Sequence, residues 1–133
     1  MSQNWVKDIA DMHGKYGVHE WIKNNPEKLE QLLHFRVAFL KEEFDETFKA
    51  TGEKDAEEIV DGLIDLCVVA IGTLDAFGVD AYKAWDEVHQ ANMSKEVGVK
   101  KERPNPLGLP DLVKPEGWIN PSHGGNYGLL NDI

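Results

Sequence analysis

Apolar residues recur along this chain at intervals of three and four, and no segment alternates strictly between apolar and polar residues. An α-helix brings positions three and four apart onto one face, whereas a half-buried strand requires a period of two. This spacing therefore predicts an all-α fold with no convincing strand. The chain has 133 residues, the size of one domain that can bury a core and gain further burial by oligomerising.

The first half of the chain carries the signals of three helical segments, of which the last is long. A first helix is expected over about 4–15, followed by a short helical segment over about 19–23. Asn25 and Pro26 then begin a long amphipathic helix, because Asn is a favoured N-cap and Pro suits the first helical position. We expect this helix to end at the Thr-Gly pair 51–52.

Two more helices are expected after that turn. Asp55 caps the third helix, and Glu58 occupies the capping-box position three residues later. The third helix is expected to run to Phe77, because Gly78 can adopt the left-handed conformation that ends a helix. Asp80 opens the fourth helix.

The C-terminal part of the chain differs in composition from the helical part. Five of the six prolines lie beyond Gly98, together with several glycines, which favours an extended arm over a packed element. We therefore divide the chain into a helical domain over 1–97 and a C-terminal arm of the same domain over 98–133.

The charge and the cysteine content exclude several functions. A formal net charge of -10 disfavours nucleic acid polymers and anionic membrane surfaces, although metal ions could still bridge the chain to a small phosphorylated molecule. Cys67 is the single cysteine, so we expect no intrachain disulfide and read this residue as a small core thiol. No signal-peptide core and no membrane-spanning run is evident, so we expect a cytoplasmic protein.

Acidic residues interrupt the most apolar helix. Glu58, Asp61 and Asp65 fall within an arc of roughly 60° on the third helix, among Ile, Val and Leu residues that predict a largely buried rod. A buried, unpaired carboxylate costs roughly several kcal/mol, and few Lys or Arg residues are near enough to pair with these acids. We therefore infer that a hard divalent cation meets them.

The second helix carries a matching set of acids. Glu43 and Glu46 flank its apolar stripe, and Glu42 lies further round the helix. Eleven residues lie between Glu46 and Glu58, which suits an antiparallel hairpin whose carboxylates face each other. A ligand set of oxygens without His or Cys favours Mg²⁺, with Mn²⁺ as the alternative, over Zn²⁺.

A surface interpretation of the acids also has to be considered. Taken alone, the run from Glu42 to Glu46 is typical of a solvated helix face. The acids within the apolar third helix argue against that interpretation, because surface charge does not account for them. Asp65 stays open between a direct metal ligand and a residue that hydrogen-bonds to the ligands.

The pattern Glu43-x-x-Glu46 followed by Glu58-x-x-Asp61 resembles the signature of the all-α nucleoside triphosphate pyrophosphohydrolases of the MazG-like superfamily. This superfamily includes dimeric dUTPases, dCTP pyrophosphatases and phosphoribosyl-ATP pyrophosphohydrolases. The resemblance extends over about residues 1–120, through LKEEFDE, EIVDGLIDLCVVAIGTLDAFGVD, EVHQANMSKE and KPEGW, and points to the compact single-domain branch found in bacteria and phages. It implies a four-helix bundle. One departure is Gly62, which stands where many MazG proteins have Glu.

The resemblance implies Mg²⁺-dependent hydrolysis of a nucleoside triphosphate between the α and β phosphates, giving nucleoside monophosphate and pyrophosphate. The metal ligands implied are Glu43, Glu46, Glu58 and Asp61, with Asp65 as a further candidate. Glu42 or Glu46 would orient or deprotonate the attacking water. Lys95 is the expected phosphate contact with Asn92 beside it, and Arg36 is a weaker candidate.

Base recognition is expected from the first helix, which walls the base pocket in related enzymes. It offers Trp5, Asp8, Met12 and His13, although we favour a core position for Trp5 over a pocket position. We read the histidines as surface or internally satisfied residues, because they lack metal-ligand spacing. The substrate expected first is dGTP, with dCTP and dUTP left open.

The resemblance also implies a homodimer or homotetramer, in which a neighbouring chain completes the pocket and the arm with Trp118 crosses the interface. Two alternatives to this function remain. One is a phosphoribosyl-ATP pyrophosphohydrolase of histidine synthesis, and the other is a non-enzymatic helical interaction module with a structural metal.

Overall fold

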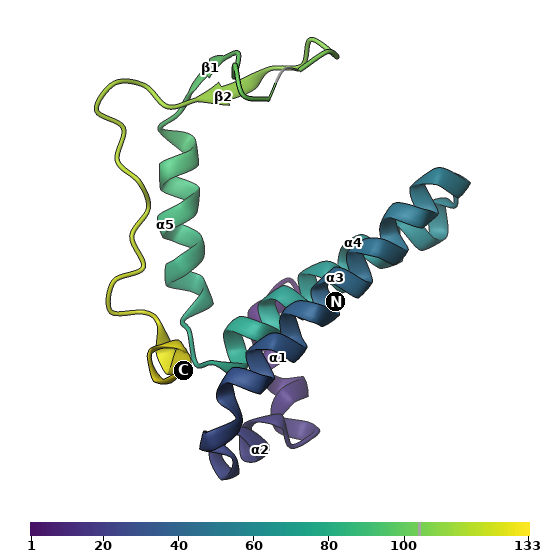
Figure 1. The fold of residues 1–133 in the computed structure, drawn as a ribbon, viewed down its shortest axis with the longest axis vertical. Coiled ribbons are helices and arrows are strands. Elements are labelled where there is room, and N and C mark those ends of the chain that lie inside the picture. The colour runs from purple at the N-terminus through teal and green to yellow at the C-terminus, as the bar shows by residue number, and fades with distance from the viewer. Residues whose placement is uncertain (104) are drawn as a thin grey trace. The chain divides into compact units, whose positions relative to one another are not determined.

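The computed structural model describes residues 1–103 and 105–133, which form two compact units (Figure 1). The first unit comprises residues 1–81 and 125–133, and the second comprises residues 82–124. The first holds α1 (Trp5–Lys15), α2 (Val18–Asn24), the 3₁₀ helix η1 (Pro26–Lys28), α3 (Leu29–Glu53), α4 (Ala56–Ala76) and the 3₁₀ helix η2 (Gly128–Asp132). The second holds nearly all of α5 (Ala81–Met93), with β1 (Glu96–Gly98) and β2 (Asp111–Val113).

The chain is mostly helical, as its periodicity predicts, and its helix starts follow the capping residues only in part. The side chain of Asn4 accepts from the N–H of Lys7 at 3.0 Å and caps α1. Asn25 stands at the predicted N-cap position, with Pro26 as the first helical residue, but its side chain makes no capping hydrogen bond and its amide donates instead to the carbonyl of Trp21 at 2.7 Å. The turn that follows is a 3₁₀ helix, and α3 begins only at Leu29.

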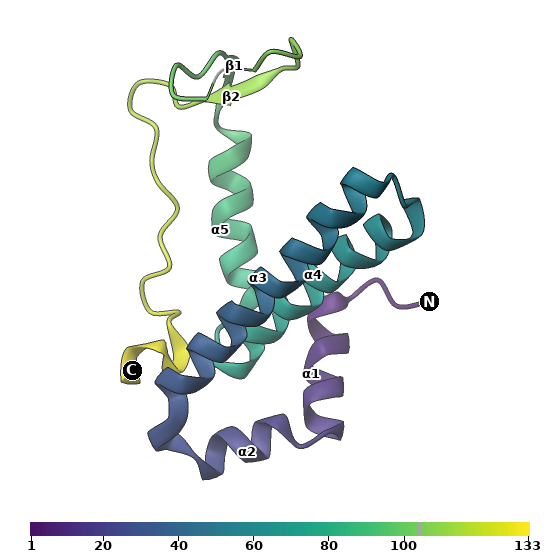
Figure 2. The same ribbon diagram turned by 45° about the vertical axis from the view of Figure 1, so that its right-hand side comes forward.

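α3 and α4 lie side by side as an antiparallel hairpin, which confirms the predicted arrangement (Figure 2). α3 continues past the predicted end at 51–52 to Glu53, because Lys54, at φ 56°, takes the left-handed conformation instead of Gly52. The carboxylate of Asp55 accepts from the N–H of Glu58 at 3.2 Å, as its capping role predicts.

The two helices of this hairpin approach closely at Gly62. A Cβ atom at Gly62 would lie 2.2 Å from Oγ1 of Thr47, and that hydroxyl donates to the carbonyl of Glu43 at 2.8 Å. Only glycine can sit at this distance from the neighbouring helix. The contact is a physical reason for the absence of a Glu side chain at position 62.

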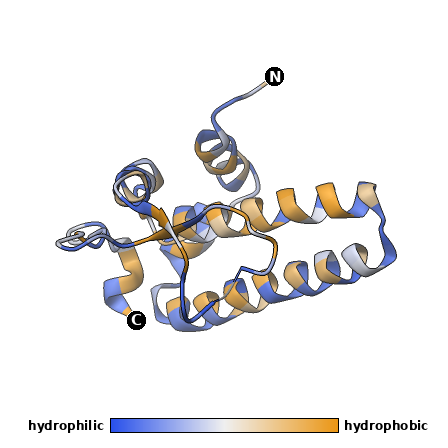
Figure 3. Ribbon diagram, turned by 90° about the horizontal axis from the view of Figure 1, so that it is seen from above, coloured by the Kyte–Doolittle hydropathy of each residue, from blue (hydrophilic) through white to orange (hydrophobic). Residues whose placement is uncertain are grey.

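One expectation about α4 is wrong. The apolar sequence of this helix predicts burial, yet Val60, Leu63 and Ile64 are each between 45% and 63% exposed. In this single chain α4 contacts α3, α1 and α2, which leaves part of its apolar surface uncovered. Figure 3 shows apolar residues along both long helices of the hairpin.

The core of the first unit lies where α4 ends. Phe77 is fully buried there against Ile22, Leu29 and Ala76. The last residues of the chain return to this core, because Leu129 packs against it and donates its N–H to the carbonyl of Phe77 at 2.7 Å. The arm expected over 98–133 is therefore extended only in part.

A buried asparagine fastens the chain end within the first unit. Asn126 accepts from the N–H of Asp80 at 2.8 Å and donates to the carbonyl of Asp80 at 2.9 Å. Both backbone groups of Asp80 are thus hydrogen-bonded by one side chain.

The second unit contains a short hairpin that the sequence did not reveal. β1 pairs antiparallel with β2, with Val97 opposite Leu112. Strands of three residues are too short for a period of two to be recognised, so the expectation of no strand is wrong. Trp118 packs on α5, where its indole N–H donates to the carbonyl of Ala91 at 2.8 Å.

No single helix in the described part of the chain is both long and apolar enough to cross a membrane, and α4 and α5 pass that test only when counted together across their bend.

Candidate functional site

Carboxylates of α3 and α4 gather across the hairpin. We call this set the acid cluster, which comprises Glu42, Glu43 and Glu46 on α3 with Asp61 and Asp65 on α4. Glu43 and Asp65 are half-buried in it. The pKa of Glu43 is raised above its ordinary value, first by desolvation and then by the negative charges of Asp65, Glu46, Glu42 and Asp61. The carboxylates predicted to face one another are therefore electrostatic neighbours.

No Lys, Arg or His side chain in the described part of the chain forms an ion pair with any of the five carboxylates, so their repulsion is not relieved in this way. Lys41, which is close in sequence, binds Asp45 at 2.7 Å on the exposed side of α3. Five oxygen-donor groups without a matching positive charge are the ligand type that hard divalent cations prefer. The chemistry of this donor set thus fits Mg²⁺ or Mn²⁺, and in the described part of the chain no three of these carboxylates bring an oxygen each within 4.8 Å of one another.

The physical reason for a cation differs from the one inferred from sequence. Asp61 and Glu58 are exposed and Asp65 is half-buried, so the burial cost expected for these acids is smaller than predicted. The remaining reason for a bound cation is the repulsion among the carboxylates. Glu58 lies in the first turn of α4 and is not among the described acids that raise the pKa of Glu43.

A cavity of about 200 Å³ lies between α1 and α4, and we call it the α1–α4 cavity. Its lining consists of Trp5, Asp8, Ile9, Ile64, Cys67, Val68 and Ile71. Trp5 is 52% exposed and forms part of this wall, so the core position favoured for it is wrong. Ile64 and Val68 each lie three residues beyond an acid of the cluster, about 4.5 Å along the helix. The cavity therefore adjoins the acid cluster along α4.

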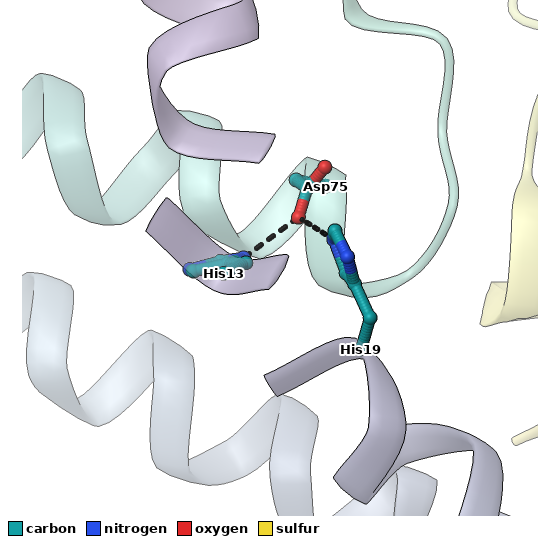
Figure 4. A group of neighbouring side chains, drawn as sticks. All are labelled: His13, His19 and Asp75. Carbon is teal, nitrogen blue, oxygen red and sulfur yellow. Dashed lines mark hydrogen bonds and ion pairs between the residues drawn. The ribbon is translucent and has the colours of Figure 1, made fainter. Parts of the chain in front are cut away.

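Met12 and His13 do not line the α1–α4 cavity, although both were expected beside Trp5. Met12 is 38% exposed on α1. His13 is buried and hydrogen-bonded to Asp75, which turns its ring toward the C-terminal end of α4 (Figure 4).

A larger cavity of about 650 Å³ lies between α2 and α3, and we call it the α2–α3 cavity. Its lining consists of Tyr16, Gly17, Val18, Trp21, Lys28, Gln31, Leu32, Phe35, Arg36 and Ala76. No carboxylate is among these residues, so the cavity cannot supply the oxygen ligands of a hard metal. It offers apolar walls with two cationic side chains.

Arg36 is tied into the fold. Its guanidinium donates to the hydroxyl of Thr73 at 3.1 Å and to the carbonyl of Val69 at 3.1 Å. Burial lowers its pKa, and the charge of Asp75 opposes that effect. At least two of its five donors are therefore engaged within the first unit.

The two phosphate contacts expected first, Lys95 and Asn92, belong to the second unit. Asn92 is exposed near the end of α5. The ammonium of Lys95 lies 5.4 Å from the ring centroid of Trp118, and that of Lys114 lies 5.0 Å from the same ring. Trp118 is thus a neighbour of Lys95 that the sequence did not assign to it.

The structure also brings together three residues that the sequence left unconnected. Nδ1 of His13 and Nε2 of His19 each lie 2.7 Å from the same oxygen of Asp75, as Figure 4 shows. The sequence separations are 62 and 56 residues, so no local motif could have identified this cluster.

The comparison with known families concerns the helical part of the chain. A family model described as phosphoribosyl-ATP pyrophosphohydrolase matches residues 18–92, which include α2, α3, α4 and most of α5. The matched region contains every carboxylate of the acid cluster. No curated protein matches the chain.

Proposed function

Since the chain belongs to the phosphoribosyl-ATP pyrophosphohydrolase family, within the all-helical MazG-like superfamily, we propose that it hydrolyses a nucleoside triphosphate between the α and β phosphates. The family makes the protein an enzyme that acts on a nucleotide pyrophosphate bond. The products of the proposed reaction are nucleoside monophosphate and pyrophosphate. This reading favours an enzyme over the helical interaction module considered from sequence.

The uncompensated acid cluster carries the proposal. Glu43, Glu46, Asp61 and Asp65 would hold Mg²⁺, or Mn²⁺ in its place, and Glu58 remains a proposed ligand from the next turn of α4. Such an ion, when bound, neutralises phosphate charge and polarises the scissile linkage.

The remaining steps belong to the side chains of the chain. Glu46 is exposed one turn from Glu43, so its carboxylate can orient the attacking water and take its proton. Glu42 is the second candidate for this role. Lys95 and Asn92 are proposed as phosphate contacts, and Arg36 as a weaker one, because ammonium, amide and guanidinium groups donate hydrogen bonds to phosphate oxygens.

The α1–α4 cavity is proposed to hold the base. The ring of Trp5 offers a stacking surface, and the carboxylate of Asp8 can accept N–H groups from the edge of a base. Guanine presents an imide N–H and an amino group on one edge, which supports dGTP as the first substrate. Cytosine and uracil present fewer donors, and dCTP and dUTP stay as alternatives. Met12 and His13 do not line this cavity, so their proposed effect on base recognition would be indirect.

Phosphoribosyl-ATP itself is a second candidate substrate, because the matching family is described by its hydrolysis. Hydrolysis of this bulkier nucleotide would break the same linkage, between its α and β phosphates.

The exposed apolar surface of α4 supports a homodimer or homotetramer, in which a neighbouring chain covers Leu63 and Ile64. A four-helix bundle and a role for the C-terminal arm at the interface belong to the same proposal.

Product analysis tests the function. The purified protein is incubated with Mg²⁺ and a panel of dGTP, dCTP, dUTP and phosphoribosyl-ATP, and pyrophosphate is resolved from orthophosphate. We expect monophosphate and pyrophosphate from dGTP. Release of diphosphate and orthophosphate would contradict the proposed bond, and turnover of phosphoribosyl-ATP alone would establish the second candidate.

A further inference from the structure

Three helices meet at the cluster of His13, His19 and Asp75, which we call the His–Asp cluster. His13 lies in the last turn of α1, His19 near the start of α2, and Asp75 in the last turn of α4 (Figure 4). One potential ligand atom from each residue lies within 4.8 Å of the others. The cluster belongs to the first unit and shares no residue with the acid cluster.

The donor set of the His–Asp cluster differs in kind from that of the acid cluster. Two imidazole nitrogens with one carboxylate oxygen are a ligand set of zinc and related first-row cations, whereas Mg²⁺ prefers oxygen ligands. A metal ion lies about 2.0–2.2 Å from each such donor. The present separations of 2.7 Å from each ring nitrogen to Oδ2 of Asp75 would therefore have to widen by only a small amount.

The ends of two helices favour a positive charge at this place, whereas the nearby charge of Arg36 opposes one. His13 and Asp75 lie at the C-terminal ends of α1 and α4, where the helix dipoles attract cations. The nearby guanidinium of Arg36 directs hydrogen bonds to Thr73 and Val69, not to Asp75. Oδ2 of Asp75, which lies 2.7 Å from a ring nitrogen of each histidine, therefore receives no hydrogen bond from Arg36.

The cluster combines one buried histidine with one exposed histidine. The side chain of His13 is 5% exposed and packs beside Gly72, where a Cβ atom would lie 3.3 Å from its ring. The side chain of His19 is 46% exposed, which leaves a route for an ion and for a water ligand. The ring of His13 is thus held by packing, and that of His19 has room to adjust.

We propose that His13, His19 and Asp75 form a structural site for a borderline divalent cation such as Zn²⁺, distinct from the hard-metal site of the acid cluster. The ion would tie the turn between α1 and α2 to the end of α4. That turn contains Gly17, which at φ 80° adopts a conformation that glycine tolerates best, and it forms one wall of the α2–α3 cavity. Binding would therefore fix this wall.

A cobalt titration tests the site without a variant. The chelator-treated full chain receives Co²⁺ in buffer with excess Mg²⁺, and its visible d–d absorption is recorded. We expect one Co²⁺ per chain, displaced by Zn²⁺ and insensitive to Mg²⁺, with a higher melting temperature when Zn²⁺ is bound. Absence of the cobalt bands, or their loss on adding Mg²⁺, would overturn the proposal.

Matched histidine variants locate the ion. His19→Gln removes an accessible donor, and the affinity for Zn²⁺ should fall by at least about a hundredfold, since even residues that only orient a metal ligand account for 10–100-fold. His34→Gln changes an exposed histidine on α3 and should leave the affinity unchanged. Equal binding by both variants, with intact circular dichroism, would refute the assignment. Pyrophosphohydrolase turnover with Mg²⁺ is measured in the same samples. The zinc site does not depend on the proposed function, so loss of Zn²⁺ binding and absence of turnover are separate results.

Discussion

Glu43 lies where four other carboxylates act on one carboxyl group. Its raised pKa follows from desolvation and like-charge repulsion, and neither effect is relieved by a Lys or Arg in the described part of the chain. At the scale of single residues, the protein therefore stores unfavourable electrostatic energy that a divalent cation would offset.

Neutralising a single carboxylate of the acid cluster should stop turnover without unfolding the chain. Glu46→Gln removes the proposed proton acceptor, and Asp61→Asn removes a proposed metal ligand, so we expect kcat to fall by about 10²–10⁴-fold. Pyrophosphate release measures the effect, and circular dichroism should stay unchanged. Asp45→Asn is the matched control, because Asp45 pairs with Lys41 outside the cluster. Loss of helicity in the active-site variants would make those residues structural.

The pKa of Glu43 also predicts how the stability of the metal-free protein depends on pH. Because this pKa is higher in the folded state, the folded protein binds more protons, and the free energy of unfolding falls as pH rises from below 4.5 through the raised value. Urea unfolding of wild type and Glu43→Gln, in chelator at several pH values, isolates this contribution. The wild type should lose stability relative to the variant as pH rises, and parallel pH profiles would disprove the effect.

The hairpin of α3 and α4 is the element that assembles the acids. Its helices approach closely where Gly62 faces Thr47, near the two sets of carboxylates. Gly62 thus permits a close approach of the two helices at this point.

Two glycine substitutions in this hairpin should have opposite effects on stability. Gly62→Ala would force the Thr47 side chain or the helix to shift, and we expect a loss of about 1–3 kcal/mol together with reduced turnover. Gly52→Ala places a methyl group in open space within a helix, and should gain about 0.5–1 kcal/mol. Urea denaturation measures both changes. A neutral Gly62→Ala would show that the helices have room to separate.

The whole molecule leaves apolar surface uncovered, while its chain end is well fastened. Leu63 is 53% exposed on α4, in contrast to the end of the chain, where Asn126 and Leu129 bind back to the first unit. The exposed apolar face lies on the helix that carries two acids of the cluster, which supports the proposal that a second copy covers this helix.

Light scattering after size-exclusion chromatography tests this association. We expect the mass of a dimer or tetramer, and Leu63→Gln should weaken association by at least about tenfold, because a buried leucine side chain contributes roughly 1.5–3 kcal/mol. Ile133→Gln changes an apolar side chain of similar exposure at the last residue and serves as control. A monomer at all concentrations would contradict the proposed oligomer.

Local signals in the sequence determined much of this protein. Apolar periodicity and caps such as Asp55 predicted the helices and the hairpin, because these depend on residues within a few positions of one another. The acid cluster followed from that hairpin. Contacts between distant residues could not be predicted in this way: the His–Asp cluster, the pocket position of Trp5, the return of the chain end to Phe77 and the pairing of β1 with β2. Tertiary packing alone decided these features, because each joins segments whose separation along the chain leaves no periodic or capping signal.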